Sequence, residues 1–261
     1  MLKRFLSAIF TFALLATPLK AAATDYSDMW YNPLESGWGA NLVQAEDVIF
    51  VTFFVYDQDN LPTWFVAIIY RDASGNFVGN LYTTVGPYFG APWNPAAYSA
   101  THSGFAWFYP SNPYQGRLVY SLTGGPTVEK QIQRQTLKPI TLAADYAGGQ
   151  TGTYAGCMDT SQNGPYTDYY HLNVTQSGNS ATFVFEYQSG ASCTMSGTLE
   201  QHGQLYRIGA ASYSCTGTLT FNTTAIMEEI KATAQGIEGR FSAGGVGGSC
   251  QESALFSAAL F

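Results

Sequence analysis

The run at residues 48–70, VIFVTFFVYDQDNLPTWFVAIIY, restricts the fold of this chain more than any other stretch. Its two halves are rich in β-branched and aromatic residues, and turn-forming residues at 57–60 separate them, so the run predicts a β-hairpin. Other short segments with alternating apolar residues lie on both sides of it. They predict an antiparallel meander, with further strands near 38–45, 77–85, 103–109, 116–122 and 126–135.

Both sides of the predicted strand at 48–56 are apolar. Ile49 and Val51 fall on one side, and Phe50 and Phe54 fall on the other. Strands of this kind are covered on both sides in folded proteins. We therefore expect a cover over the outer side of the hairpin. The segment at 86–103, rich in proline and aromatic residues, and a second domain are the two candidates.

The composition is typical of a secreted all-β protein. Aromatic residues make up 15% of the chain and charged residues 11%, so uncharged polar residues must cover most of the surface. The second half also alternates, with turn residues near 177–179, 189–190 and 201–203. The segment 225–234 could be a short amphipathic helix, but the hairpin pattern after it favours a strand. The expected fold is all-β, with two antiparallel meander barrels after a cleaved N-terminal signal helix.

Residues 1–23 have the pattern of an export signal. Lys3 and Arg4 precede an apolar segment too short to span a bilayer, and small residues at 21–23 favour cleavage after Ala23. We expect an exported protein, periplasmic or extracellular, with no transmembrane helix in the mature chain. Removing the signal leaves eight basic residues against 18 acidic ones, which argues against nucleic acid as a partner.

The two halves of the mature chain differ in tryptophan and cysteine content. All five Trp precede residue 138 and all four Cys follow it. This partition predicts a Trp-rich β domain at 24–140 and a Cys-containing β-barrel domain at 141–261. The second domain opens with the pattern TGTYAGC, which is similar in outline to the first strand of lipocalin- and avidin-like barrels.

Four cysteines in an exported chain predict two disulfides, for which three pairings are possible. Cys193 and Cys215 bracket one predicted hairpin. Cys157 and Cys250 lie on the first and last strands of the second domain, which become neighbours in a closed barrel. We therefore expect the pairs Cys193–Cys215 and Cys157–Cys250, each contributing roughly 3–4.5 kcal/mol in the chain-entropy description.

The familiar catalytic motifs are missing from this sequence, which contains no G-x-S-x-G, H-E-x-x-H or C-x-x-C. His102, His171 and His202 are scattered, and none pairs with another at metal-ligand spacing. We therefore expect no catalytic residues, no metal and no cofactor, and the interpretation leans away from an enzyme.

The segment WYNPLESGWG at 30–39 combines two predicted turns with aromatic residues and one carboxylate. The turns would bring Trp30 and Trp38 toward one spot, with Glu35 between them. Together with Trp64 they would offer stacking faces and an orienting acid, as sites for polar rings do. The structural alternative is a barrel end plugged by tryptophan, with Glu35 accepting backbone N–H bonds.

This segment is followed by an apolar strand, then by PTW at 62–64 and GPYFGAP at 86–92. In this order the motifs resemble those of a group of exported bacterial β-proteins that carry W-x-N-P-x-E-S-G-W-G and P-T-W. The resemblance covers roughly residues 28–138. It implies export and a β architecture, and it carries over no catalytic residue.

These observations favour an exported, non-catalytic binding protein for a small ring-bearing ligand, either a saccharide or an aromatic compound. The expected ligand-binding residues are Trp30, Glu35, Trp38 and Trp64. Three alternatives stay open: a structural protein that binds a surface partner, a carboxylate-based hydrolase and an outer-membrane β-barrel. The hydrolase would use Glu35, and Glu228 is the other acid least typical of a surface.

Overall fold

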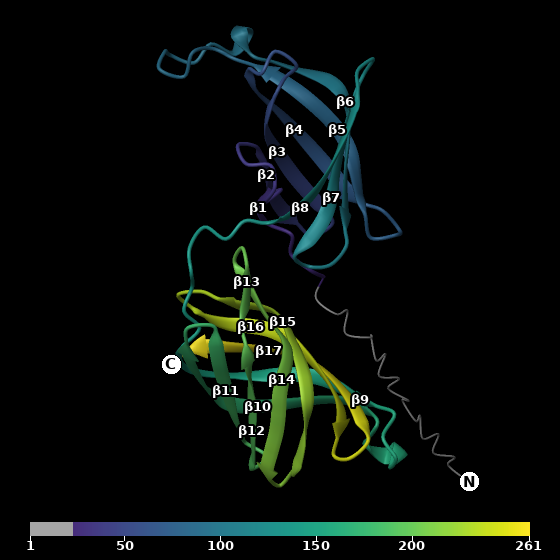
Figure 1. Cartoon of the computed structure of the whole chain (residues 1–261), viewed down its shortest axis with the longest axis vertical. Helices are drawn as coiled ribbons and strands as arrows, with labels where there is room; N and C mark the ends of the chain where they lie inside the picture. The colour runs from purple at the N-terminus through teal and green to yellow at the C-terminus, as the bar shows by residue number, and fades with distance from the viewer. Residues whose placement is uncertain (1–22) are drawn as a thin grey trace, which may run out of the picture.

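The structure is a computed structural model that describes residues 23–261. Of the expected signal peptide, residues 1–22 lie outside the described residues. The described chain forms two antiparallel β-barrels, which Figure 1 shows one beyond the other along the long axis of the molecule. The all-β prediction is confirmed, since the described helices are two short 3-10 turns, η1 (Pro95–Ala97) and η2 (Thr160–Gln162).

The first barrel is a closed meander in which β1 pairs with β8. Its strands are β1 (Asp28–Tyr31), β2 (Gly39–Ala45), β3 (Val48–Tyr56), β4 (Pro62–Arg71), β5 (Phe77–Val85), β6 (Ser99–Pro110), β7 (Gln115–Leu122) and β8 (Thr127–Arg134). The hairpin expected at 48–70 is β3 and β4. Its turn is held by Asp57, whose Oδ1 accepts the backbone N–H groups of Asp59 and Leu61, both at 2.9 Å.

The second barrel contains the remaining strands. They are β9 (Ala144–Ala155), β10 (Gly164–Ser177), β11 (Ser180–Tyr187), β12 (Ala191–Thr198), β13 (Glu200–His202), β14 (Leu205–Gly217), β15 (Phe221–Ala232), β16 (Gly236–Val246) and β17 (Cys250–Leu260). Pairing of β12 with β14 and of β17 with β9 closes the ring, and the short β13 extends one end of it. The segment favoured as a strand near 225–234 lies in β15 and the turn after it.

Both expected disulfides are present. Cys157–Cys250 joins the chain just after β9 to the start of β17, and Cys193–Cys215 joins β12 to β14. Cys193 and Cys215 are direct cross-strand partners. Cys157 and Cys250 lie just beyond Ala155 and Gln251, the residue pair at one end of β9 and β17. Both bridges therefore stabilise pairings on which closure of the second barrel depends.

The two barrels meet at one end of each. The ring of Tyr114 stacks on that of His202, with centroids 4.6 Å apart, and its Oη accepts the backbone N–H of Glu229 at 2.9 Å. Burial in this contact raises the pKa of Tyr114 to about 12. Asp28 Oδ2 also accepts the backbone N–H of Gln204 across the junction, at 3.0 Å.

Among residues 23–261, no segment covers the outer side of the 48–70 hairpin. Phe50, Phe54 and Ile68 point away from the barrel interior and are exposed. The segment 86–98 is itself exposed and extends from the top of the first barrel, and the second barrel lies at the opposite end (Figure 1). Both candidates for the cover were wrong, because the chain turns outward after β5 and the barrels join end to end.

Candidate functional site

The end of the first barrel that faces away from the second barrel is shaped by the turn at 32–38. Asn32 forms the turn with its backbone oxygen, which accepts from the N–H of Glu35, and with its Oδ1, which accepts from the N–H of Leu34. Gly37 then takes a φ of 105°, which glycine tolerates at little cost. Because Trp38 has the same strand parity as buried Ala40, its indole points inward at this end.

Glu35, Trp38 and Lys130 meet at this place. Lys130 Nζ donates a hydrogen bond to Glu35 Oε2 at 2.6 Å, and Trp38 Nε1 donates to the same oxygen at 3.1 Å. The ammonium also lies 5.8 Å from the centre of the indole ring, within the range of a cation–π contact. The bond from Lys130 is the main reason why the pKa of Glu35 lies below its usual value.

Side chains that point inward at this end keep part of their surface exposed, whereas those at the other end are fully buried. The ring of Tyr120 contacts the rings of buried Phe53 and Phe65, with centroids 5.7 and 5.5 Å apart. Burial raises the pKa of Tyr120, and nearby Lys130 lowers it less. We name this end the distal mouth and define it by the partly exposed Glu35, Trp38, Val55, Tyr120, Leu122 and Lys130.

The distal mouth offers two kinds of interaction. The indole of Trp38 and the phenol of Tyr120 provide apolar ring surface, while Glu35 and Lys130 provide an acceptor and donors at its rim. Ligand sites commonly combine apolar walls with a few placed polar groups. A carboxylate with a lowered pKa is ionised at neutral pH and is a poor general acid, so this arrangement suits binding better than proton transfer.

Trp30 does not join this group. Its side chain is fully buried at the opposite end of the barrel, where its ring packs edge-on against Phe108 at 5.3 Å and Nε1 donates to the backbone oxygen of Tyr26. Trp30 and Trp38 both point inward. The backbone of Trp30 is paired with Ala40, two residues beyond Trp38, and its ring extends from there toward Tyr26 and Phe108, away from the mouth. Trp30 therefore closes the end of the first barrel that meets the second barrel, as the structural alternative expects of a tryptophan. The other part of that alternative is wrong, since Glu35 accepts from the side chains of Lys130 and Trp38 and not from backbone N–H groups.

Trp64 is also apart from the distal mouth. It is 51% exposed and has the strand parity opposite to that of buried Phe65 and Ala67, so it lies on the outside of β4. Its cross-strand partner is the equally exposed Phe54. Of the four expected ligand-binding residues, the structure brings together Glu35 and Trp38, and it separates Trp30 and Trp64 from them.

Lys130 and Tyr120 were not among the expected site residues. A signal for Lys130 exists in the segment TVEKQIQR, where it shares a strand side with Ile132 and Arg134. A lysine on the apolar side of a strand marks either a strand end or an internal partner. Nothing in the sequence places its ammonium beside Glu35, because the two residues are 95 positions apart.

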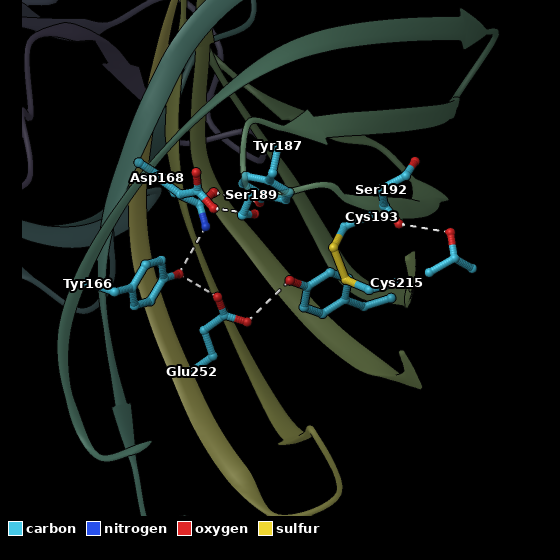
Figure 2. Close-up of a disulfide and its surroundings, with 11 residues drawn as sticks. Tyr166, Asp168, Tyr187, Ser189, Ser192, Cys193, Cys215 and Glu252 are labelled. Carbon is cyan, nitrogen blue, oxygen red and sulfur yellow. Dashed lines mark hydrogen bonds between the residues drawn. A yellow bond between two sulfur atoms is a disulfide. The ribbon is translucent and has the colours of Figure 1, made fainter. Parts of the chain in front are cut away.

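A second cluster of polar groups lies inside the second barrel, around Glu252 (Figure 2). Tyr166 and Tyr213 donate hydrogen bonds to its two carboxylate oxygens, the latter at 3.2 Å, and Gln150 links Tyr166 to Tyr187 with bonds of 2.9 Å. Burial raises the pKa of Glu252 above its usual value, and the tyrosine bonds oppose that shift. Both oxygens are satisfied within the fold, so this cluster is assigned to the barrel core.

Two surface grooves lie outside the distal mouth. One of about 510 Å³ runs along the junction of the barrels, and another of about 570 Å³ continues over the outside of β15, β16, β17, β9 and β10. Several of the charged side chains that line them form ion pairs, as in Arg240 with Glu229 at 3.1 Å and Lys231 with Asp25 at 3.8 Å. Of the described residues that line these two grooves, the aromatic ones are Tyr166, Tyr169, Phe241 and Phe256. We place the candidate site at the distal mouth because of the chemistry of its side chains.

Glu228 lies on the outside of β15 and contacts Arg207 at 3.5 Å. In a regular strand Ile226 and Ile230 would flank it on the same side. A bulge after Glu228, in which Glu229 has a φ of 52°, instead turns Ile230 into the core while Ile226 stays exposed. Glu228 is far along the chain from Glu35 and lies in the other barrel, so the structure does not pair these acids.

Comparisons with known proteins add little to this description. No family model matches the chain, and no curated protein matches it. Among solved structures, a protein of unknown function from the DUF3598 family of Nostoc punctiforme is similar at 10% identity, over 89% of this chain and 93% of that chain, with a TM-score of 0.27. At this TM-score the similarity carries no argument, so fold and site rest on this chain's own residues.

Among residues 23–261, no helix is both long and apolar enough to cross a membrane.

The role of Lys130 at the mouth can be tested through Glu35. In Lys130→Met the pKa of Glu35 is expected to rise toward its ordinary value, because its main stabilising partner is removed. The lowered pKa of Glu35 stabilises the fold above the ordinary pKa of a glutamate, and this contribution is lost as the pH falls through the lowered value. Carbon-13 NMR titration of the Glu35 carboxyl group measures the shift.

The matched control for this titration is Lys231→Met, which removes a lysine that contacts Asp25. It is expected to leave the Glu35 titration unchanged. An equal pKa of Glu35 in the parent protein and in Lys130→Met would contradict the contact.

Proposed function

We propose that this chain is an exported, non-catalytic binding protein that holds a small ring-bearing ligand, a saccharide or an aromatic compound, in the distal mouth of its first barrel. The observation that carries the proposal is the meeting of an indole, a phenol and a carboxylate–ammonium pair at a barrel end whose inward side chains are only partly buried. Barrel mouths are common places for small-molecule sites. The two disulfides support the exported location.

The charge balance at the mouth favours an uncharged ligand. Glu35 is already paired with Lys130, so a charged ligand would compete with that pair for one of its partners. Hydroxyl groups of a sugar or a phenol can instead accept from the ammonium and donate to the carboxylate. A ring stacked on Trp38 or Tyr120 would cover apolar surface that is now exposed to water.

The proposal is tested by titrating the exported protein with a panel of neutral glycans and aromatic metabolites while tryptophan fluorescence is recorded. For any member that binds, Trp38→Leu and Tyr120→Leu are expected to weaken the affinity by about 10- to 100-fold, because each removes a stacking face. Trp64→Leu is the control, since Trp64 lies outside the barrel, and it should bind normally. Thermal melts establish that each variant is folded.

Two results would contradict the proposal. One is that no member of the panel binds, and the other is that a ligand binds equally well to the parent protein and to both mouth variants.

A role in binding a surface partner is favoured by a different observation, the exposed apolar outer side of the first barrel.

A further inference from the structure

The outside of the first barrel carries an apolar surface that is centred on β3 and β4 and includes residues of β2 and β6. Neighbouring strands bring its side chains into register, since Phe50 is paired with Val43 and Ile68, and Phe54 with Trp64. The large apolar side chains of this surface are between 41% and 57% exposed. We name this surface the outer face and define it by Val43, Phe50, Phe54, Tyr56, Trp64, Ile68, Tyr70 and Phe105.

Charge is almost absent from this part of the chain. Strands β3, β5 and β6 contain no Asp, Glu, Lys or Arg, and β4 has only Arg71 at its end, which is paired with Asp47 at 3.0 Å. The chain as a whole has a formal net charge of −7. Large exposed apolar patches on soluble proteins mark interaction sites, and an uncharged patch is where two acidic molecules can approach with least repulsion.

A second unpartnered apolar element leaves the same barrel. Residues 86–98, which we name the arm, connect β5 to β6 and contain no charged residue. Tyr88, Phe89, Trp93 and Tyr98 are exposed on it, Phe89 completely. Every hydrogen bond and ring contact that the structure gives to residues 86–98 lies within the arm, as in the contact of Trp93 with Tyr98 at 6.3 Å. Figure 1 shows this segment extending away from the barrel.

We propose that a second copy of this chain covers the outer face, with the outer face and arm of each copy packed against those of the other in a two-fold dimer. The face and the arm are both uncharged and apolar, and each lacks a partner within the part of its own chain that the structure describes. In a two-fold dimer the same surface of both copies forms the interface, so the outer face and the arm of both copies are covered and no further copy can add. Packing of side chains rather than strand addition is expected at this face, because β3 and β4, which carry most of it, are hydrogen-bonded to a strand on both sides.

The apolar area is large enough for a stable dimer. An aromatic side chain has roughly 150–250 Å² to bury. The six rings of the outer face, each about half exposed, then supply roughly 600 Å², and the four rings of the arm supply a similar area. The sum exceeds the roughly 800 Å² that each partner contributes to a standard protein interface. The doubly apolar pattern of β3 and β4 is also explained, since both sides of these strands would then be covered.

The test measures the mass of the full exported protein by sedimentation equilibrium across the micromolar range. A dimer is expected for the parent protein. Ile68→Lys and Tyr70→Lys place a charge in the outer face and are expected to raise the dimer dissociation constant at least about 30-fold. The arm variant Trp93→Ser is expected to weaken the dimer in the same direction. These side chains are on the surface, so the barrel itself should stay folded.

The matched control is Tyr169→Lys, which makes the same substitution at a residue of the second barrel that is 58% exposed, against 57% for Tyr70. It should leave the dimer intact. A parent protein that stays monomeric throughout the range, or a dimer that survives both Ile68→Lys and Tyr70→Lys, would overturn the proposal. So would a monomer that floats with vesicles of phosphatidylethanolamine and phosphatidylglycerol and loses this binding in Ile68→Lys, since a lipid surface would then be the occupant.

Discussion

Replacing Cys157 and Cys250 by alanine is expected to lower the free energy of unfolding of the second barrel by about 4–5 kcal/mol. The bridge closes a loop of 93 residues that contains β10 to β16, so reducing it releases a large conformational entropy in the unfolded chain. It also joins the first and last strands, whose pairing closes the ring. Urea unfolding followed by far-UV circular dichroism measures the loss.

The chain contains two internal controls for this experiment. All five Trp lie in the first barrel, so tryptophan fluorescence should report an unchanged unfolding transition of that barrel. Removing the other bridge, Cys193–Cys215, opens a loop of only 22 residues and is expected to cost about 3–3.5 kcal/mol. A larger loss from the shorter loop would contradict the entropic account of both bridges.

Arg134→Met is expected to destabilise the first barrel by about 3–5 kcal/mol, because it leaves the buried Asp28 without its charge partner. Both side chains are almost inaccessible to solvent, and Nη1 of the guanidinium is 3.2 Å from Asp28 Oδ2. The same guanidinium donates to the backbone oxygens of Asp25, Ser27 and Pro113, and it lies 5.1 Å from the ring of Trp30. It therefore ties the N-terminal segment to the end of the barrel that meets the second barrel.

Urea unfolding followed by tryptophan fluorescence tests this prediction, since the fluorescence reports the first barrel. The double variant Asp28→Asn/Arg134→Met is the control, because it removes both charges. It should be more stable than Arg134→Met, since no unpaired buried charge remains. The opposite result would be that Asp28→Asn destabilises the Arg134→Met protein by as much as it destabilises the parent protein. The loss in Arg134→Met would then come from missing packing and backbone contacts, and not from an unpaired charge on Asp28.

The strands of both barrels could be predicted from the sequence, because alternating apolar residues and turn-forming residues are local signals. Residues of one parity in β3 and β4 are apolar and buried, and the turns between them contain Asp, Asn or Gly where the backbone requires them. The disulfides could be predicted because hairpin order in a closed meander makes only certain strands neighbours. The position of the barrels end to end was not foreseen, because it depends on contacts such as Tyr114 with His202 that join distant parts of the chain.

The candidate site was foreseen only in part. Strand parity places Trp38 inside and Trp64 outside, but the start of β2 must be known before the parity can be used. Trp30 and Trp38 are close in sequence, but the turn at 32–38 reverses the chain direction between them. Their rings therefore lie at different heights along the axis of the first barrel. Lys130 could not be connected with Glu35 by any local pattern, because only barrel closure through β1 and β8 brings them together.

The sharpest measurement of ligand binding at the distal mouth uses the indole N–H signals of the nitrogen-15-labelled protein, one for each of its five Trp. Single Trp→Phe variants assign the signals, and the protein is then titrated with the neutral glycan and aromatic panel. We predict that a binding member shifts the signal of Trp38, whose Nε1–H donates to Glu35, while that of buried Trp30 stays in place. Shifts confined to Trp64 or Trp93, or an unmoved Trp38 signal with every member of the panel, would contradict the proposed site.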